Sequence, residues 1–184
     1  LDFQQMLSCY APIKHFFISE EANSTEQAVL LNKLSEYNLV IVGLHKSNVN
    51  AWKSYKIGKK ADILLQSIAL QSKVVVSVFA NPYSLNSFLF TNNFDALILG
   101  YQNSKLAQKE LAKAVFGGIG VNGKIPVATK HYNINAGLET TPIRINYVSP
   151  EEIGFNTNLL YKIDSIVYDA IYEKATPGCQ ILIA

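Results

Sequence analysis

The fold of this chain is decided by the stretch Val74-Val75-Val76-Ser77-Val78-Phe79, in which five of six residues are apolar and four are β-branched. A continuous apolar run of this length predicts a strand buried on both faces, as in a parallel sheet covered by helices. Two similar runs lie on either side of it, Leu39-Val40-Ile41-Val42-Gly43 and Ala96-Leu97-Ile98-Leu99-Gly100. We expect all three to be strands of one buried sheet.

Longer amphipathic stretches separate these runs. Apolar residues recur at helical spacing from Lys59 to Leu70, and again after Ser104, which we expect to cap a helix that Gly117-Gly118 ends. Nearer the N-terminus, Ser24 followed three residues later by Gln27 predicts a capping box at the start of another helix. Helices therefore alternate with the strands.

Three shorter elements complete this pattern. Ile13–Ile18 is expected to form a first strand, and Asn81-Pro82 to begin a short helix that continues to Phe90. Ile125–Ala128 predicts a brief edge strand, because Pro126 has no N–H to donate inside a sheet. Strands alternating with helices indicate βαβ units with right-handed connections. The expected fold class is α/β, a three-layer α/β/α sandwich with a mostly parallel, flavodoxin-like sheet, followed by a C-terminal helix-strand stub.

The last part of the chain has a different pattern. Residues 129–150 show no sustained period and are expected to be a tail or linker. A strongly apolar helix is predicted from Asn156 to Glu173, and a strand from Cys179 to Ala184. We expect a domain at 1–147 and a truncated stub at 148–184. An apolar helix without a partner surface favours association, so a homo-oligomer formed through the stub is a candidate assembly.

Composition and residue spacing exclude several classes of protein. Charged residues make up 16% of the chain and the formal net charge is +2, so no nucleic-acid partner is expected. The apolar runs are far shorter than the roughly 20 residues that cross a bilayer, so no membrane span is expected. Cys9 and Cys179 lie near opposite ends, and the histidines have no metal-ligand spacing, so neither a disulfide framework nor a metal site is expected.

The motifs that carry chemistry are weak in this sequence. Gly118–Gly123 has the spacing of a dinucleotide fingerprint, but it follows a helix, whereas the fingerprint must follow a strand and open a helix. No cofactor is therefore expected. The acidic pairs Glu20-Glu21 and Glu151-Glu152 precede helices, whose dipoles they complement, and Asp62 is expected to face solvent or to cap. With no Gly-x-Ser-x-Gly and no Ser-x-x-Lys in the sequence, neither common serine nucleophile is present.

The position of one histidine favours binding. Open α/β sheets bind their ligands at the carboxyl ends of the strands. His45 follows the strand that ends at Gly43, so it is a candidate binding residue, with an ordinary surface-loop position as the alternative.

The order of these landmarks resembles the C-terminal α/β sandwich domain of glycoside hydrolase family 3, especially its β-N-acetylglucosaminidase and β-glucosidase-like members. The resemblance covers residues 11–147. The segments that carry it are Lys73–Tyr83, Asp95–Ser104, Ala114–Gly118 and Asn122–Val127.

A second resemblance covers residues 148–184. Val148–Phe155, the helix that ends at Ala175-Thr176-Pro177-Gly178 and the strand after it look like the opening of a serine β-lactamase or penicillin-binding-type domain. The Ser-x-x-Lys nucleophile of that class would come after Ala184. The chain is therefore expected to be a piece of a longer protein.

The first resemblance implies a function without catalysis. The family carries its nucleophilic aspartate on an N-terminal (β/α)₈ barrel, and no glutamate here matches the acid/base found in some sandwich domains. The implied role is an accessory domain that packs on such a barrel and shapes the sugar cleft. The intact protein would hydrolyse terminal β-N-acetylglucosaminide or β-glucoside bonds, in the periplasm or after secretion. Candidate residues for the cleft or the barrel interface are His45, Asn81, Tyr83, Tyr101, Gln102 and Asn103.

Two alternatives stay open. The chain could be a free-standing flavodoxin-like module that binds a small ligand, with the fluorescence of Trp52 as a reporter. Alternatively, a downstream β-lactamase-like or esterase-like domain could set the function of the intact protein.

Overall fold

The computed structural model describes residues 1–46 and 55–181. The chain divides into two compact units, Leu1–Asn146 and Tyr147–Ala184, and each is described by itself. This division falls one residue before the boundary expected from the sequence. The relation of either unit to a known domain family stays a prediction.

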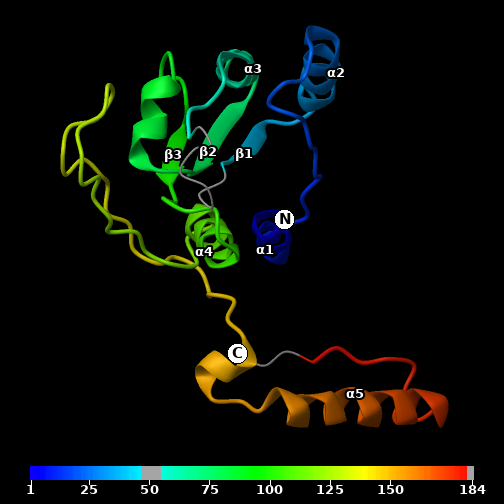
Figure 1. Cartoon of the computed structure of the whole chain (residues 1–184). Coiled ribbons are helices and arrows are strands. Elements are labelled where there is room, and N and C mark those ends of the chain that lie inside the picture. The colour runs from blue at the N-terminus through cyan, green and yellow to red at the C-terminus, as the bar shows by residue number, and fades with distance from the viewer. Residues whose placement is uncertain (47–54, 182–184) are drawn as a thin grey trace. The chain divides into compact units, whose positions relative to one another are not determined.

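A parallel sheet forms the centre of the first unit (Figure 1). It consists of β1 (Leu39–His45), β2 (Lys73–Phe79) and β3 (Ala96–Leu99), in the order β1-β2-β3. Both pairs are parallel, with Val42 opposite Val76 in one and Val76 opposite Leu97 in the other. With helices on both faces, this arrangement confirms the predicted α/β class.

Helices cover each face of the sheet with a separate apolar cluster. The four helices are α1 (Asp2–Tyr10), α2 (Ser24–Leu34), α3 (Lys59–Ala69) and α4 (Lys105–Val115). One cluster joins Val74, Val76 and Val78 of β2 to α2 and α3. The other joins Phe79, whose side chain points to the opposite face, to α1 and α4. The central run thus has helices on both sides, as its unbroken apolar character predicts.

Local capping signals fix where the helices begin. Ser104 caps α4, accepting a hydrogen bond from the N–H of Ala107 at 3.2 Å, as expected. The predicted capping box of α2 is wrong by one residue, because Asn23 is the cap and Glu26 its partner. Asn is as good a cap as Ser, and a carboxylate accepts the cap N–H better than an amide does.

Two predicted strands are absent from the structure. Residues 13–18 are extended but lie in no strand, and Ile125–Ala128 forms none either. A strand needs a neighbour, and the described chain provides none beside residues 13–18. Ile125 instead exchanges backbone hydrogen bonds with Asn135 and Ala136, within the irregular segment that follows α4.

Two further expectations need correction. The predicted helix after Pro82 is a short 3₁₀ helix, η1 (Pro82–Ser87). The strand β1 was expected to be buried on both faces, yet Leu39 is exposed and the rest of β1 is half-buried. The reason is that β1 lies at the edge of the described sheet.

The second unit contains η2 (Pro150–Ile153) and α5 (Thr157–Tyr172). The predicted long helix is confirmed, with Asn156 as its cap. The predicted strand from Cys179 does not form through Ile181, and residues 182–184 lie outside the described chain. Among the helices of the described chain, none is long and apolar enough to span a membrane.

Candidate functional site at the carboxyl edge of the sheet

Parallel strands bring the ends of β1, β2 and β3 to one edge of the sheet. His45 is the last residue of β1, Asn81 follows β2, and Tyr101–Asn103 follow β3. The candidate residues therefore share this edge. Residues 47–54, which follow His45 and Lys46, lie outside the described chain.

A chain of hydrogen bonds links two of the candidates across the edge. His45 Nδ1 lies 2.9 Å from Asn103 Oδ1, and Gln108 Nε2 donates to the same oxygen at 2.9 Å. Gln108 Oε1 in turn accepts from the backbone N–H of Phe3 at 3.3 Å. Residues from β1, the β3–α4 loop, α4 and α1 thus meet in one polar relay.

This relay fixes the tautomer of the histidine. The backbone N–H of Phe3 can only donate, so the Gln108 atom facing it must be the amide oxygen. The Gln108 nitrogen then donates to Asn103, which makes the facing Asn103 atom an oxygen too. An oxygen cannot donate here, so His45 Nδ1 carries the proton and Nε2 carries a lone pair.

Apolar surroundings hold the imidazole neutral. Its ring stacks on Phe79 with centroids 4.4 Å apart and has its edge toward Phe3 at 6.2 Å. Burial lowers the pKa of His45 below its ordinary value of 6.5, while the bond to Asn103 opposes this and the Leu1 amino group reinforces it. The side chain is therefore a neutral hydrogen-bond acceptor at neutral pH, suited to a hydroxyl donor or to a base role.

A glycine makes room for this ring. A Cβ at Gly43 would lie 2.8 Å from His45 Nε2 and 3.2 Å from Phe3 Cδ1. Gly43 precedes His45 by two residues, so both face the same side of β1. Because Gly43 has no side chain, the imidazole of His45 can lie against the backbone of β1 at this point.

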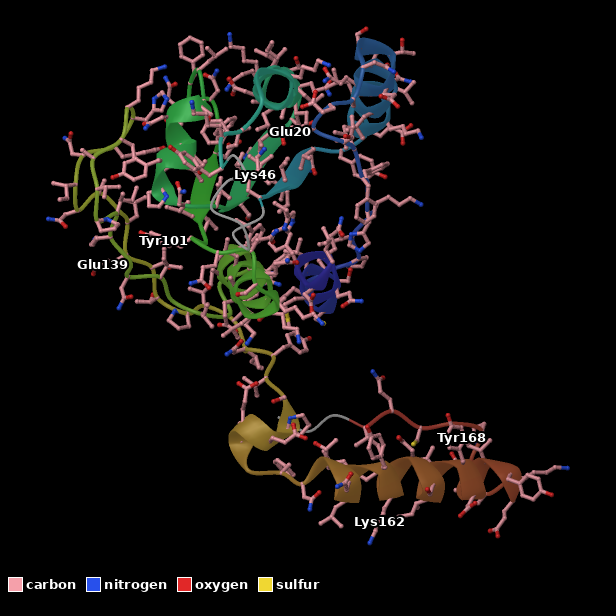
Figure 2. All side chains as sticks on the ribbon, in the orientation of Figure 1. Glu20, Lys46, Tyr101, Glu139, Lys162 and Tyr168 are labelled. Carbon is pink, nitrogen blue, oxygen red and sulfur yellow. The ribbon has the colours of Figure 1, made fainter. Side chains whose placement is uncertain are left out.

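The other predicted residues have separate environments. Tyr101 has a left-handed backbone with φ 59°, and its hydroxyl donates to the carbonyl of Lys124 at 3.2 Å. This bond connects the edge to the irregular segment after α4, within which Lys124 pairs with Glu139 at 3.0 Å (Tyr101 and Glu139 in Figure 2). Tyr83 and Gln102 are exposed, and Asn81 Oδ1 is buried without a hydrogen-bond partner among the described residues.

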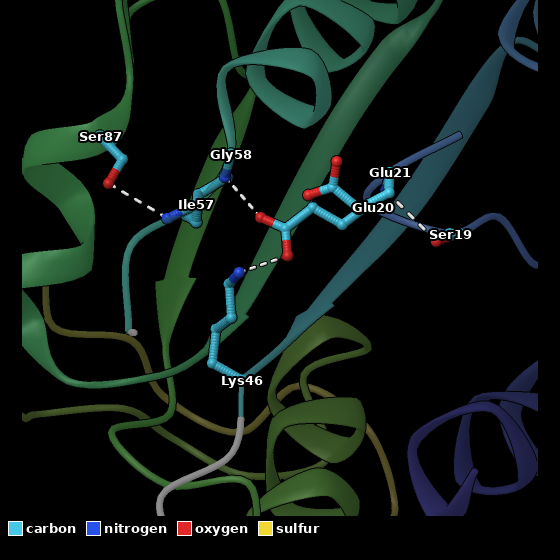
Figure 3. A network of polar contacts seen from close by, with 7 residues as sticks. All are labelled: Ser19, Glu20, Glu21, Lys46, Ile57, Gly58 and Ser87. Atoms are coloured by element: carbon cyan, nitrogen blue, oxygen red, sulfur yellow. Dashed lines mark hydrogen bonds and ion pairs between the residues drawn. The ribbon is translucent and has the colours of Figure 1, made fainter. Parts of the chain in front are cut away.

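A second polar cluster at this edge was not predicted (Figure 3). Glu20 accepts hydrogen bonds from Lys46 Nζ and from the backbone N–H of Gly58, which is the N-cap of α3. Its carboxylate thus joins residues 11–20 to the end of β1 and to the start of α3. The three residues lie up to 38 positions apart, so no local pattern could have revealed the cluster.

Asp62 was expected to face solvent or to cap, and the structure shows that it is buried. Only 1% of it is exposed, and its carboxylate accepts from the N–H of Leu89 at 3.0 Å and from Gln66 Nε2 at 3.2 Å. It connects α3 to the chain after η1. Its role is structural, because both its oxygens are used inside the fold.

A cavity of about 590 Å³ opens beside β1. It lies between residues 11–20 on one side and residues 39–46 on the other, with side chains of α1, α2 and α3 around it. His45, Glu20 and Lys46 line it, and the rest of its lining is mostly apolar.

Fold and site define this unit as a parallel α/β domain with a neutral histidine at the carboxyl edge of its sheet. Within the ranges that the structure describes, no three side chains of His, Cys, Asp or Glu are grouped to hold a metal ion. No protein-family model, curated protein or solved structure matches the chain.

Proposed function

We propose that the first unit is a non-catalytic accessory domain of a family 3 glycoside hydrolase, whose carboxyl edge forms one wall of a sugar site. The motif resemblance supplies the family. The observation that carries the binding role is the relay that leaves His45 Nε2 as an acceptor at the edge. Sugars present many hydroxyl donors, and Tyr83 and Tyr101 keep 47% and 37% of their surface exposed for stacking.

The environment of the acidic groups supports a role without catalysis. Cleavage of a glycosidic bond by the common routes needs two carboxyl groups facing each other across the sugar. Glu20, which reaches this edge, is already engaged by Lys46 and by the N–H of Gly58. The reacting carboxylates would belong to a barrel in the same polypeptide.

Two measurements on the chain test this proposal. With 4-nitrophenyl β-N-acetylglucosaminide or β-glucoside we expect no turnover, and measurable hydrolysis would overturn the non-catalytic role. In nuclear magnetic resonance titrations, millimolar N-acetylglucosamine or glucose should shift the signals of His45 and of the Asn103 side-chain amide. A His45→Ala variant should lose these shifts, and their absence from the unchanged chain would contradict the sugar wall.

The predicted barrel partner needs its own test. A (β/α)₈ barrel from a family 3 β-N-acetylglucosaminidase, produced without its sandwich domain, should bind this chain and gain thermal stability from it. A Tyr101→Asp exchange should weaken that complex, because it places a charge in the interface. Failure of every such barrel to bind would leave the domain without its proposed partner.

One observation favours a second candidate, a free-standing ligand-binding module. The cavity beside β1, at about 590 Å³, lies within the roughly 300–1,000 Å³ of small-molecule pockets. Saturable quenching of Trp52 fluorescence by a nucleotide or an apolar ligand would support this candidate. Trp52 itself lies outside the described residues.

A further inference from the structure

Among the described residues, one hydrogen-bonding edge of β1 has no partner. Lys46 N–H donates to Phe79 O at 3.2 Å, and Lys73 N–H donates to Asn38 O at 3.1 Å. Alternate residues of a strand face alternate neighbours, so even-numbered residues of β1 face β2. The N–H and C=O groups of Leu39, Ile41, Gly43 and His45 therefore point away from β2, and β1 lines the cavity.

An extended segment lies across the cavity from this edge. Among the described residues, the backbone of residues 12–18 makes no hydrogen bond, and this whole segment lines the same cavity. It runs parallel to β1, since it leads to Glu20, which contacts Lys46 just past the end of β1. Two parallel extended segments thus flank one empty space, each with unpaired backbone groups.

The first helix begins at the end of this space. Phe3 of α1 contacts His45 and Phe79, the final residues of β1 and β2. Leu1 also lines the cavity. The start of α1 therefore lies at the carboxyl edge, where a strand in the cavity parallel to β1 would end.

The hand of the connections agrees with a strand in this place. Two connections of the chain, from residues 13–18 to β1 and from β1 to β2, cross the sheet in the same direction. Their helices, α2 and α3, lie on the same face of the sheet. A strand in the cavity followed by α1 and residues 13–18 would move the opposite way with its helix on the other face. All three connections then have the same hand, as parallel sheets require.

We propose that this cavity is the seat of a fourth parallel β-strand, formed by polypeptide joined to the amino side of Leu1. It pairs with β1 on one side and with residues 13–18 on the other. The resulting order, with the new strand between residues 13–18 and β1, is the flavodoxin-like order 2-1-3-4-5. Residues 13–18 then become a strand as well, which is what their sequence predicts.

The lining of the cavity defines the chemistry of this strand. Leu7 and Ile13 lie on the side of α1, and Leu34 and Leu64 on the side of α2 and α3. A strand between them has apolar neighbours on both faces, so it must be continuously apolar and rich in β-branched residues. Seven residues, the length of β1, would fill the edge.

The proposed strand also explains why the histidine lies at this place in the strand order. In this order the direction of the connections reverses between the new strand and β1, and such switch points are where open sheets bind ligands. His45 ends β1 at that point. This consequence does not depend on which ligand the crevice takes.

The test extends the chain itself. One version carries Lys-Val-Val-Ile-Val-Val-Val and a Gly-Ser-Gly loop ahead of Leu1. The control carries the same extension with its third and fifth residues changed to Pro, which cannot pair inside a sheet. Amide hydrogen exchange is followed at Ile41 and Gly43, with Val42, which already faces β2, as internal reference.

The first extension should slow exchange at Ile41 and Gly43 by about tenfold or more, while the proline control leaves both unchanged. Equal exchange in the two versions would overturn the proposal. If the extended chain does not stay in solution, the free acetylated peptide is added to the 184-residue chain. Slower exchange at the same amides then supports the strand, and unchanged exchange overturns it. Neither result involves a sugar, so the proposed function stands or falls separately.

Discussion

Gly43, two residues before the end of β1, determines whether His45 can keep its position. A Cβ at Gly43 would lie 2.8 Å from Nε2 of that ring, closer than real side chains approach. The ring is also confined by Phe3 and Phe79, so it cannot move aside freely. Because Gly43 carries a hydrogen atom where other residues carry a Cβ, the His45 ring can stay in its hydrogen bond with Asn103.

We expect Gly43→Ala to destabilise the fold by about 1–3 kcal/mol, the range for an overfilled core site. Urea unfolding measures this loss, and nuclear magnetic resonance should show a broken contact between His45 and Asn103. Gly123→Ala is the matched control, because its Cβ would meet nothing within 4 Å. Equal stabilities of the two variants would show that the His45 ring can move to accommodate a methyl group at position 43.

The protonation of His45 links stability to pH. Its pKa in the folded chain is lowered below 6.5, chiefly by burial. Below pH 6.5 the unfolded chain therefore binds a proton that the folded chain does not, and stability falls as the pH drops, down to the folded pKa. Above pH 6.5 the imidazole is neutral in both states and the effect vanishes.

We expect urea midpoints at about pH 7.5 and pH 5.5 to differ more for the unchanged chain than for His45→Gln. The variant keeps a polar side chain but has no proton to gain. If the urea midpoint changed equally between the two pH values in both proteins, His45 would not be the group that links stability to pH.

At the scale of elements, Glu20 joins three parts of the first unit. Its carboxylate accepts from Lys46 and from the backbone N–H of Gly58, the residue at which α3 starts. Lys46 and Glu20 keep 16% and 34% of their side-chain surface exposed, so solvent screens part of the attraction. The hydrogen bond to the helix start is the larger expected contribution.

Glu20→Ala should destabilise the chain by about 1–2 kcal/mol, because the N–H of Gly58 and the ammonium of Lys46 lose their charged acceptor. Its neighbour provides the control. Glu21 pairs with Lys60 at 3.9 Å, and both side chains are well exposed, so Glu21→Ala should leave the urea midpoint unchanged. If the two variants behaved alike, Glu20 would not be holding these elements together.

Elements and contacts differ in how far the sequence predicts them. The apolar runs of β1, β2 and β3 and the cap of α4 are local signals, and the structure confirms them. Residues 13–18 have the composition of a strand, but pairing depends on a neighbour that the described chain does not place there. The helix α1 was missed, since residues 2–10 have no capping residue to announce it.

The candidate site shows the same limit. The carboxyl-edge rule predicted His45 and Asn103 as members of one edge, and the structure brings them into contact. Gln108, Glu20 and Gly58 were not predicted, because their roles come from residues 5 to 105 positions away. Sequence patterns identify at which edge of the sheet these side chains gather, whereas the polar network needs the three-dimensional arrangement.

At the scale of the whole molecule, the two units differ in how they bury apolar surface. Both apolar clusters of the first unit are built from residues before Asn133, so they do not need residues 147–184. In the second unit α5 has no buried residue. Leu159, Ile166 and Ile171 keep 55%, 68% and 38% of their surface exposed. Such a helix lowers its free energy by contacting another apolar surface.

We therefore expect the full chain to self-associate at about 100 μM, in the range where exposed apolar surface promotes association, while residues 1–146 alone stay monomeric. Light scattering after gel filtration gives both masses. Ile166→Lys should weaken the association by placing a charge on the apolar face of α5. Ser165→Lys adds the same charge outside the apolar face and should not, because Ser165 lies about 100° around the helix from Ile166, on the side away from Ile163. A monomeric full chain would contradict the expectation, and equal effects of the two lysines would show that net charge, not the apolar face, controls assembly.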